Sequence, residues 1–216
     1  MINRATQSPP APPRHGLTLL EFMIAMLITS LIAVAMGGMI TAVASCIEAD
    51  RHNRESIVRG QALDVRLGSY ITPSLYILDT TAKPESIVIW LEDSRPGGTV
   101  HLTELRWIER ESATNTVVLY YVKFPDAMTQ VERDALDVEV PVAGADWWAA
   151  LATMQAAGYI DKLRLCDHVA LLDISHSTAS NQAKKIVTAT ITFTGEVGGA
   201  TLITAASIRQ LQEPTS

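Results

Sequence analysis

The sequence predicts an α+β protein: a long N-terminal hydrophobic α-helix, transmembrane in part, packed on a C-terminal globular domain rich in antiparallel β-strands. Residues 22–47 form a run without charge or proline, whereas segments beyond residue 85 alternate between apolar and polar residues with the period of a strand. The 216 residues are 48% hydrophobic with a mean hydropathy of +0.18, which suits one folded domain with an apolar appendage. The formal net charge of -6 argues against a nucleic-acid partner bound through a positive field.

The first 16 residues are short, polar and rich in proline, with SPPAPP at Ser8–Pro13. Their only basic or titratable side chains are those of Arg4, Arg14 and His15. Proline at this density blocks both helix formation and core packing. We therefore expect residues 1–16 to be a leader or a tail.

The run Phe22–Ile47 is expected to form a helix that crosses a membrane. A bilayer requires about 20 apolar residues at about 1.5 Å each; the alternative is a buried core helix. Thr29, Ser30 and Thr41 are expected to hydrogen-bond to the backbone of their own helix. The pair Gly37-Gly38 indicates either close packing between helices or a stretch that unwinds when the helix leaves the bilayer.

Glu21 is an acidic residue directly before this apolar run. A carboxylate at membrane depth is unfavourable by up to about 3 kcal/mol, so such a residue is a functional-site hypothesis and requires a partner. The alternative is a first-turn acid in the headgroup region that faces the positive end of the helix dipole. The residues around Glu21 support the first of these hypotheses, that the acid has a functional role and a partner.

Five features follow one another here: the basic Arg14-His15, then Gly16, the apolar Leu17, Glu21 four residues later, and the long apolar helix. In this order they resemble the type IV prepilin signal over about residues 14–47. The resemblance implies cleavage by a prepilin peptidase between Gly16 and Leu17, N-methylation of Leu17, and Glu21 as the acid at mature position five. The family most often has Phe at the first mature position, where this chain has Leu17.

The same resemblance implies how the chain assembles. Cleavage gives Leu17 a positive amine, which Glu21 of a neighbouring subunit can neutralise in a filament core of low dielectric constant. We expect a structural subunit without enzymatic activity or cofactor, a minor pilin or pseudopilin of a type IV pilus or a type II secretion pseudopilus. Its expected partners are other pilin or pseudopilin subunits, contacted through the N-terminal helix, and the prepilin peptidase/methyltransferase. Size and strand content resemble the J-type minor pseudopilin or the W-type minor pilin.

We expect three segments: a leader at 1–16, an N-terminal helix at 17–69 with its transmembrane part at 22–47, and an extracytoplasmic β-rich domain at 70–216. Basic residues flank both ends of the apolar run, so the positive-inside rule does not decide the orientation. The resemblance implies a single pass through the bacterial inner membrane, with the C-terminal domain outside the cytoplasm.

Two other interpretations of the N-terminus remain open. Val43-Ala44-Ser45-Cys46 fits the small-residue pattern before a lipid-modified cysteine, although an ordinary signal has an apolar core of only about 7–15 residues. A simple signal anchor is the second possibility. Under either one, the chain is a membrane-anchored or lipid-anchored (Cys46) extracytoplasmic binding module or enzyme.

Beyond the membrane segment the helix is expected to continue to about Ser69, because Pro73 limits it. The run Arg51–Glu55 predicts a solvated face. A weak apolar stripe at helical spacing supports this helix; it consists of Ile47, Arg51, Arg54, Val58, Ala62 and Val65.

Strands are predicted from β-prone runs between turn residues. The expected strands are Ser86–Leu91, Thr99–Glu109, Thr116–Phe124, Ile186–Thr194 and Ala200–Ile208, with turns at Asp93–Gly98, Glu111–Asn115 and Gly195–Gly199. Short turns between consecutive strands indicate an antiparallel sheet. In Ile186–Thr194 threonines occupy one face and apolar residues the other, which is typical of a half-buried strand.

A helix is predicted at Trp147–Ala157, with Asp146 as its N-cap and Gly158 as its stop. Its Trp147, Leu151 and Met154 recur at helical spacing, which predicts a core face, and a tryptophan ligand platform is the alternative. Tyr159–Ile174 is expected to form one or two strands, beginning with a turn at Asp161-Lys162.

The remaining sequence carries weak signals for chemistry. HExxH, CxxC, GxSxG and phosphate-loop patterns do not occur, and His101, His168 and His176 are scattered. Cys166, Asp167 and His168 are too adjacent to face one metal from a strand. Asp161, Asp167 and Asp173 lack the ligand spacing of a calcium loop. A disulfide between Cys46 and Cys166 is not expected.

Overall fold

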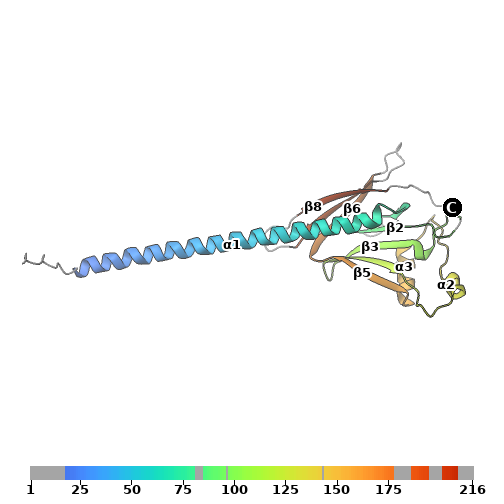
Figure 1. The fold of residues 1–216 in the computed structure, drawn as a ribbon, viewed down its shortest axis with the longest axis horizontal. Coiled ribbons are helices and arrows are strands. Elements are labelled where there is room, and N and C mark those ends of the chain that lie inside the picture. Colours follow the sequence, from blue (N-terminus) through green and yellow to red (C-terminus); the bar gives the residue numbers. More distant parts are fainter. Residues whose placement is uncertain are drawn as a thin grey trace, which may run out of the picture. The chain divides into compact units, whose positions relative to one another are not determined.

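The computed structural model describes residues 18–80, 85–95, 97–142, 144–177, 186–194 and 201–208. The chain divides into two compact units, of which the first ends at Ala49 and the second begins at Asp50. Figure 1 shows one long helix followed by strands and two short helices. The predicted α+β class is therefore confirmed.

Helix α1 runs from Leu19 to Ile71 and confirms the predicted continuous helix. It ends where Ser74 Oγ donates to the carbonyl oxygen of Ile71 at 2.6 Å, beside Pro73, which cannot continue the backbone ladder. The predicted side-chain to backbone bonds are present as well. Thr29 Oγ1 donates to Ala25 O at 2.9 Å, and equivalent bonds join Ser30 to Leu27 and Thr41 to Gly37.

The buried face of α1 differs from the predicted stripe. The buried residues are Gly60, Leu63, Leu67 and Ile71, whereas Val58 and Val65 are 63% and 72% exposed. The stripe does not mark the buried face, because two faces of the helix carry apolar residues at helical spacing. The face with leucine and isoleucine removes more apolar area from water than the face with valine and alanine. The run Arg51–Glu55 is solvated, as predicted, and carries i,i+4 ion pairs.

The first sheet contains five antiparallel strands in the order β1-β2-β3-β4-β5. Their bounds are β1 Tyr76–Asp79, β2 Ser86–Trp90, β3 Leu105–Glu111, β4 Thr116–Val122 and β5 Ile160–Cys166. Every residue of β2 is buried, because both faces of this sheet are covered. Trp90 and Trp107 lie in the apolar cluster that includes helix α3, whereas Ile87 and Ile89 lie in the cluster that includes α1.

A second sheet contains β6 (Val169–Ser177), β7 (Ile186–Phe193) and β8 (Thr201–Ser207) in that order, all antiparallel. The predicted alternation in β7 is confirmed, since Val187, Ala189, Ile191 and Phe193 are buried. The prediction of one antiparallel sheet is replaced by two sheets. The predicted turn at Gly195–Gly199 lies outside the described residues.

Several predicted boundaries are corrected. The segment Thr99–Glu109 is not one strand: a 3-10 turn η1 at Leu102–Glu104 precedes β3, which extends to Glu111. Residues 161 and 162 lie within β5 instead of a turn. The segment Tyr159–Ile174 holds two strands, which belong to different sheets, and His168 between them has a φ of 59°.

Two short helices stand among the strands of the second unit. Helix α3, Trp147–Ala156, confirms the prediction, including the N-cap: Asp146 Oδ1 accepts from the N–H groups of Trp148 and Ala149. Its Trp147, Leu151 and Met154 are buried as predicted, so core packing is the better interpretation. Helix α2, Gln130–Leu136, and strand β1 were not predicted.

Candidate functional site: the start of helix α1

The predicted processing residues Gly16 and Leu17 lie outside the described residues, and the structure begins just after them at Thr18. The carboxylate of Glu21 folds back onto this residue. Its Oε2 accepts from the backbone N–H of Thr18 at 2.7 Å and from the Thr18 hydroxyl at 2.9 Å. In return, the N–H of Glu21 donates to the Thr18 hydroxyl at 3.3 Å. These reciprocal bonds form a capping box.

This geometry satisfies N–H groups that the first turn of a helix otherwise leaves without a partner. It also places an acid at the positive end of the helix dipole, as one of the two sequence interpretations of Glu21 expects. The sequence itself contains the spacing of a capping box, Thr18-x-x-Glu21. The carboxylate is exposed.

The surface that follows Glu21 is apolar and exposed. Helix α1 is the one helix among the described residues that is long and apolar enough to cross a membrane, and its most apolar window is exposed throughout. The first buried residue of the helix is Gly60. Within the described structure, the run Phe22–Ile47 is therefore not a core helix, which removes that alternative. A Cβ at Gly37 or Gly38 would meet nothing within 4 Å, so the described chain itself requires glycine at neither position.

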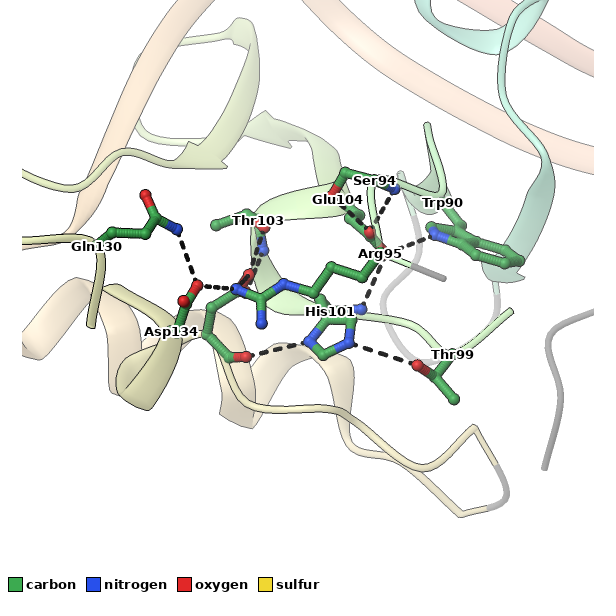
Figure 2. Close-up of polar contacts among 10 residues, drawn as sticks. Trp90, Ser94, Arg95, Thr99, His101, Thr103, Glu104, Gln130 and Asp134 are labelled. Carbon is green, nitrogen blue, oxygen red and sulfur yellow. Dashed lines mark hydrogen bonds and ion pairs between the residues drawn. The ribbon is translucent and has the colours of Figure 1, made fainter. Parts of the chain in front are cut away.

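The second unit contains a buried polar cluster around Glu104, whose side chain is 1% exposed. Figure 2 shows the donors that surround it. Oε1 accepts from the N–H and the hydroxyl of Ser94, both at 2.7 Å. Oε2 accepts from Trp90 Nε1 at 3.0 Å and from the N–H of His101 at 3.1 Å. The carboxylate therefore holds the loop after β2 against η1.

Asp137, which is 3% exposed, lies at the end of α2 and contacts η1 near Glu104. Its Oδ1 accepts from the N–H of Thr103 at 3.0 Å, and its Oδ2 accepts from the Thr103 hydroxyl at 2.8 Å. Arg95 bridges Asp137 and Asp134 at 3.1 and 2.7 Å. These groups line an open cleft of about 620 Å³. Because Arg95 is paired on both sides, the arrangement joins α2 to the sheet.

A smaller polar group lies on the first sheet. Tyr120 Oη donates to Glu111 Oε1 at 2.5 Å, and Lys162 Nζ lies 3.4 Å from the same oxygen. The bond from Tyr120 is the main cause that lowers the pKa of the Glu111 carboxyl. Burial and the same hydrogen bond raise the pKa of Tyr120. Both shifts favour the ionised acid beside a neutral phenol, which is a structural pairing.

The weak metal candidates are not brought together. Asp161 lies in β5 and contacts Lys123 at 3.3 Å, Asp167 pairs with Arg164 at 3.3 Å, and Asp173 lies in the other sheet. Among the residues that the structure describes, no group of three or more His, Cys, Asp or Glu side chains could hold a metal ion. Cys46 and Cys166 are both free, the first exposed and the second buried. Burial raises the pKa of the Cys166 thiol.

The comparison with known proteins found a similarity in one region of the chain. Residues 12–44 match the family model described as the prokaryotic N-terminal methylation motif. This segment contains the cleavage and methylation positions expected from the sequence, the capping box, and most of the apolar run. The match indicates a type IV pilin- or pseudopilin-like precursor of the kind that prepilin peptidase processes. No curated protein and no solved structure matches the chain.

Proposed function

We propose that this prepilin-like chain is a minor pilin or pseudopilin, a structural subunit of a type IV pilus or a type II secretion pseudopilus. Prepilin peptidase removes residues 1–16 by cleavage after Gly16, and the new N-terminus at Leu17 is methylated. The observation that carries the proposal is the motif match at 12–44, placed at the start of an exposed apolar helix. The chain contributes protein–protein contacts, and the chemistry is performed on it by the peptidase.

In this proposal the transmembrane part, 22–47, holds the subunit in the bacterial inner membrane before assembly, and the β-rich domain, 70–216, lies outside the cytoplasm. The exposed apolar surface of α1 supports it, because such a surface needs lipid or other helices as its surroundings. Inside a filament, helices of neighbouring subunits replace the lipid.

Glu21 is the proposed assembly residue. In the described chain its carboxylate binds Thr18, one residue away from the amine that cleavage would create. Because this carboxylate is exposed, an amine of another subunit can reach it in the proposed filament. A charge pair in an apolar core is stabilised only when both partners are present, so the pair would fix the register between subunits.

The decisive measurement is mass spectrometry of the chain purified from cells with an active prepilin peptidase. We expect an N-terminus at Leu17 that carries one methyl group. Retention of residues 1–16, or a diacylglycerol on Cys46, would contradict the proposal and favour an anchored module. The second measurement is a Glu21→Ala variant, which should insert into the membrane normally but enter sheared filaments poorly. Glu48→Ala, an exposed acid further along the same helix, is the matched control and should assemble as wild type.

A further inference from the structure

Strand β8 is one of the two edges of the second sheet, and its sequence TLITAAS contains neither a charge nor a proline. Among the described residues its strand partner is β7, in a register from Ile186 opposite Ser207 to Thr192 opposite Thr201. The N–H and C=O groups on its outer side thus have no strand partner within the described ranges. Figure 1 shows β8 at the margin of the strand-rich unit.

The two edge strands of the first sheet, β1 and β5, have features that oppose pairing with another chain, and β8 lacks these features. Strand β5 displays Lys162 and Arg164, whose side chains are 63% and 69% exposed, and exposed charges on an edge oppose pairing with another chain. Strand β1 has four residues, and its register shifts between Ile77 and Asp79. Short and bulged edges likewise pair poorly. The remaining edge, β6, contains Asp173, so β8 is the uncharged edge among the described strands.

The side chains of β8 separate into two sets. Leu202 packs near Gly60 of α1, where an added Cβ would lie 2.8 Å from Leu202 Cδ2, and Thr204 Oγ1 donates to Asp64 Oδ1. On the opposite face Ile203 is 69% exposed. One set therefore fixes the strand to the helix, while Ile203 stands on the open face at the edge.

The edge of β8 is continuous with a flank of α1. Gly60 and Asp64, which contact β8, share this flank with Ile57 because residues three and four apart lie on one side of a helix. Ile57 is 52% exposed. Ile57 therefore lies on the same side of α1 as the two residues that contact β8.

We propose that the outer edge of β8, with Ile57 beside it, is a second contact surface for a neighbouring filament subunit, which adds an extended strand to the three-stranded sheet. Only an extended chain matches a row of alternating N–H and C=O groups, so the edge itself defines the partner's backbone. The uncharged side chains exclude a partner recognised by charge. This inference rests on the proposed function, because the continuity with α1 identifies the partner as a subunit.

The test uses the full chain in cells that produce the filament, with the amount of each variant in sheared filaments compared with its amount in membranes. Ile203→Lys places a charge on the edge and should reduce incorporation at least about fivefold. Ile203→Thr keeps the edge uncharged and β-prone, so it should assemble as wild type. The matched control is Leu163→Lys on β5, at an apolar residue 45% exposed on an edge that is already charged, and it should also assemble normally.

Wild-type incorporation of Ile203→Lys, or an equal loss with Leu163→Lys, would overturn the proposal. Hydrogen exchange provides a second readout: the β8 amides should exchange more slowly in filaments than in the detergent-solubilised chain, and equal rates would overturn it. The Glu21→Ala variant is run in parallel. If Glu21→Ala fails to assemble while Ile203→Lys assembles, the β8 proposal fails and the proposed function stands. If the leader is retained, the proposed function fails.

Discussion

The buried carboxylate of Glu104 offers the sharpest test of how the strand-rich unit is held together. The variant Glu104→Gln keeps the shape of the side chain and replaces one carboxylate oxygen with an NH2 group. Four donors converge on the two oxygens of Glu104: Ser94 N, Ser94 Oγ, Trp90 Nε1 and His101 N. In either orientation of the amide, at least one backbone or indole N–H then faces another donor.

The size of the effect follows from this count. A buried donor without an acceptor costs about 1–3 kcal/mol, and hydrogen bonds to a charged group contribute about 1.5–3 kcal/mol against about 1 for neutral pairs. We expect Glu104→Gln to lower the free energy of unfolding by about 2–4 kcal/mol. Glu104→Ala removes the acceptor from all four donors and should lower it by more than about 4 kcal/mol.

Urea denaturation of the detergent-solubilised full chain, followed by tryptophan fluorescence, measures this effect. The four tryptophans lie between residues 90 and 148, so the signal reports on the second unit and is silent on the apolar segment of α1. Glu92→Gln, at an exposed acid two residues after β2, should stay within about 0.5 kcal/mol of wild type. A Glu104→Gln variant as stable as this control would refute the structural role assigned to the Glu104 carboxylate.

Three further predictions concern single contacts. Gly60→Leu should lower the free energy of unfolding by about 1–3 kcal/mol, measured in the same urea titration, because its Cβ would meet Leu202; unchanged stability would contradict that close approach. Asp146→Ala should cost about 1 kcal/mol by removing the N-cap of α3, and Asp146→Asn, which keeps an acceptor oxygen, should restore most of it. Tyr120→Phe should raise the pKa of Glu111, followed by NMR titration of its carboxyl carbon. In the wild type, the stability that ionised Glu111 contributes is present above the pKa of the unfolded chain and is lost as pH falls through the lowered folded pKa.

The periodicity of apolar residues predicted those helices and strands whose sequence pattern lies within a short window. The helix that ends near Pro73, the capped helix after Asp146 and the alternating strand β7 all carry their pattern within a short window. Helix α2 escaped prediction although Thr129 and Glu132 form a capping box, because seven residues without a buried side chain show no apolar period. Strand β1 escaped because it has only four residues.

The candidate site was readable from the sequence for a different reason. A proline-rich segment, a glycine, an acid and an apolar run lie in one continuous stretch, so their order alone predicts processing and assembly. The capping bonds between Thr18 and Glu21 are equally local and follow a known spacing. The exposed edge of β8 had no such signal, since whether a strand lies at an edge depends on which strands pair with it.

The amino-acid sequence by itself determined the long helix, its apolar half and the motif before it, because each depends on neighbours along the chain. Tertiary structure alone decided which flank of α1 is buried: two apolar stripes compete, and packing against the sheets selects Leu63 and Leu67 over Val58 and Val65. It also decided that Glu104 is buried, because its four donors come from residues up to 14 positions away that meet only when β2 and η1 are in place. Burial of a charge depends on where its partners lie in space, and no local pattern records that.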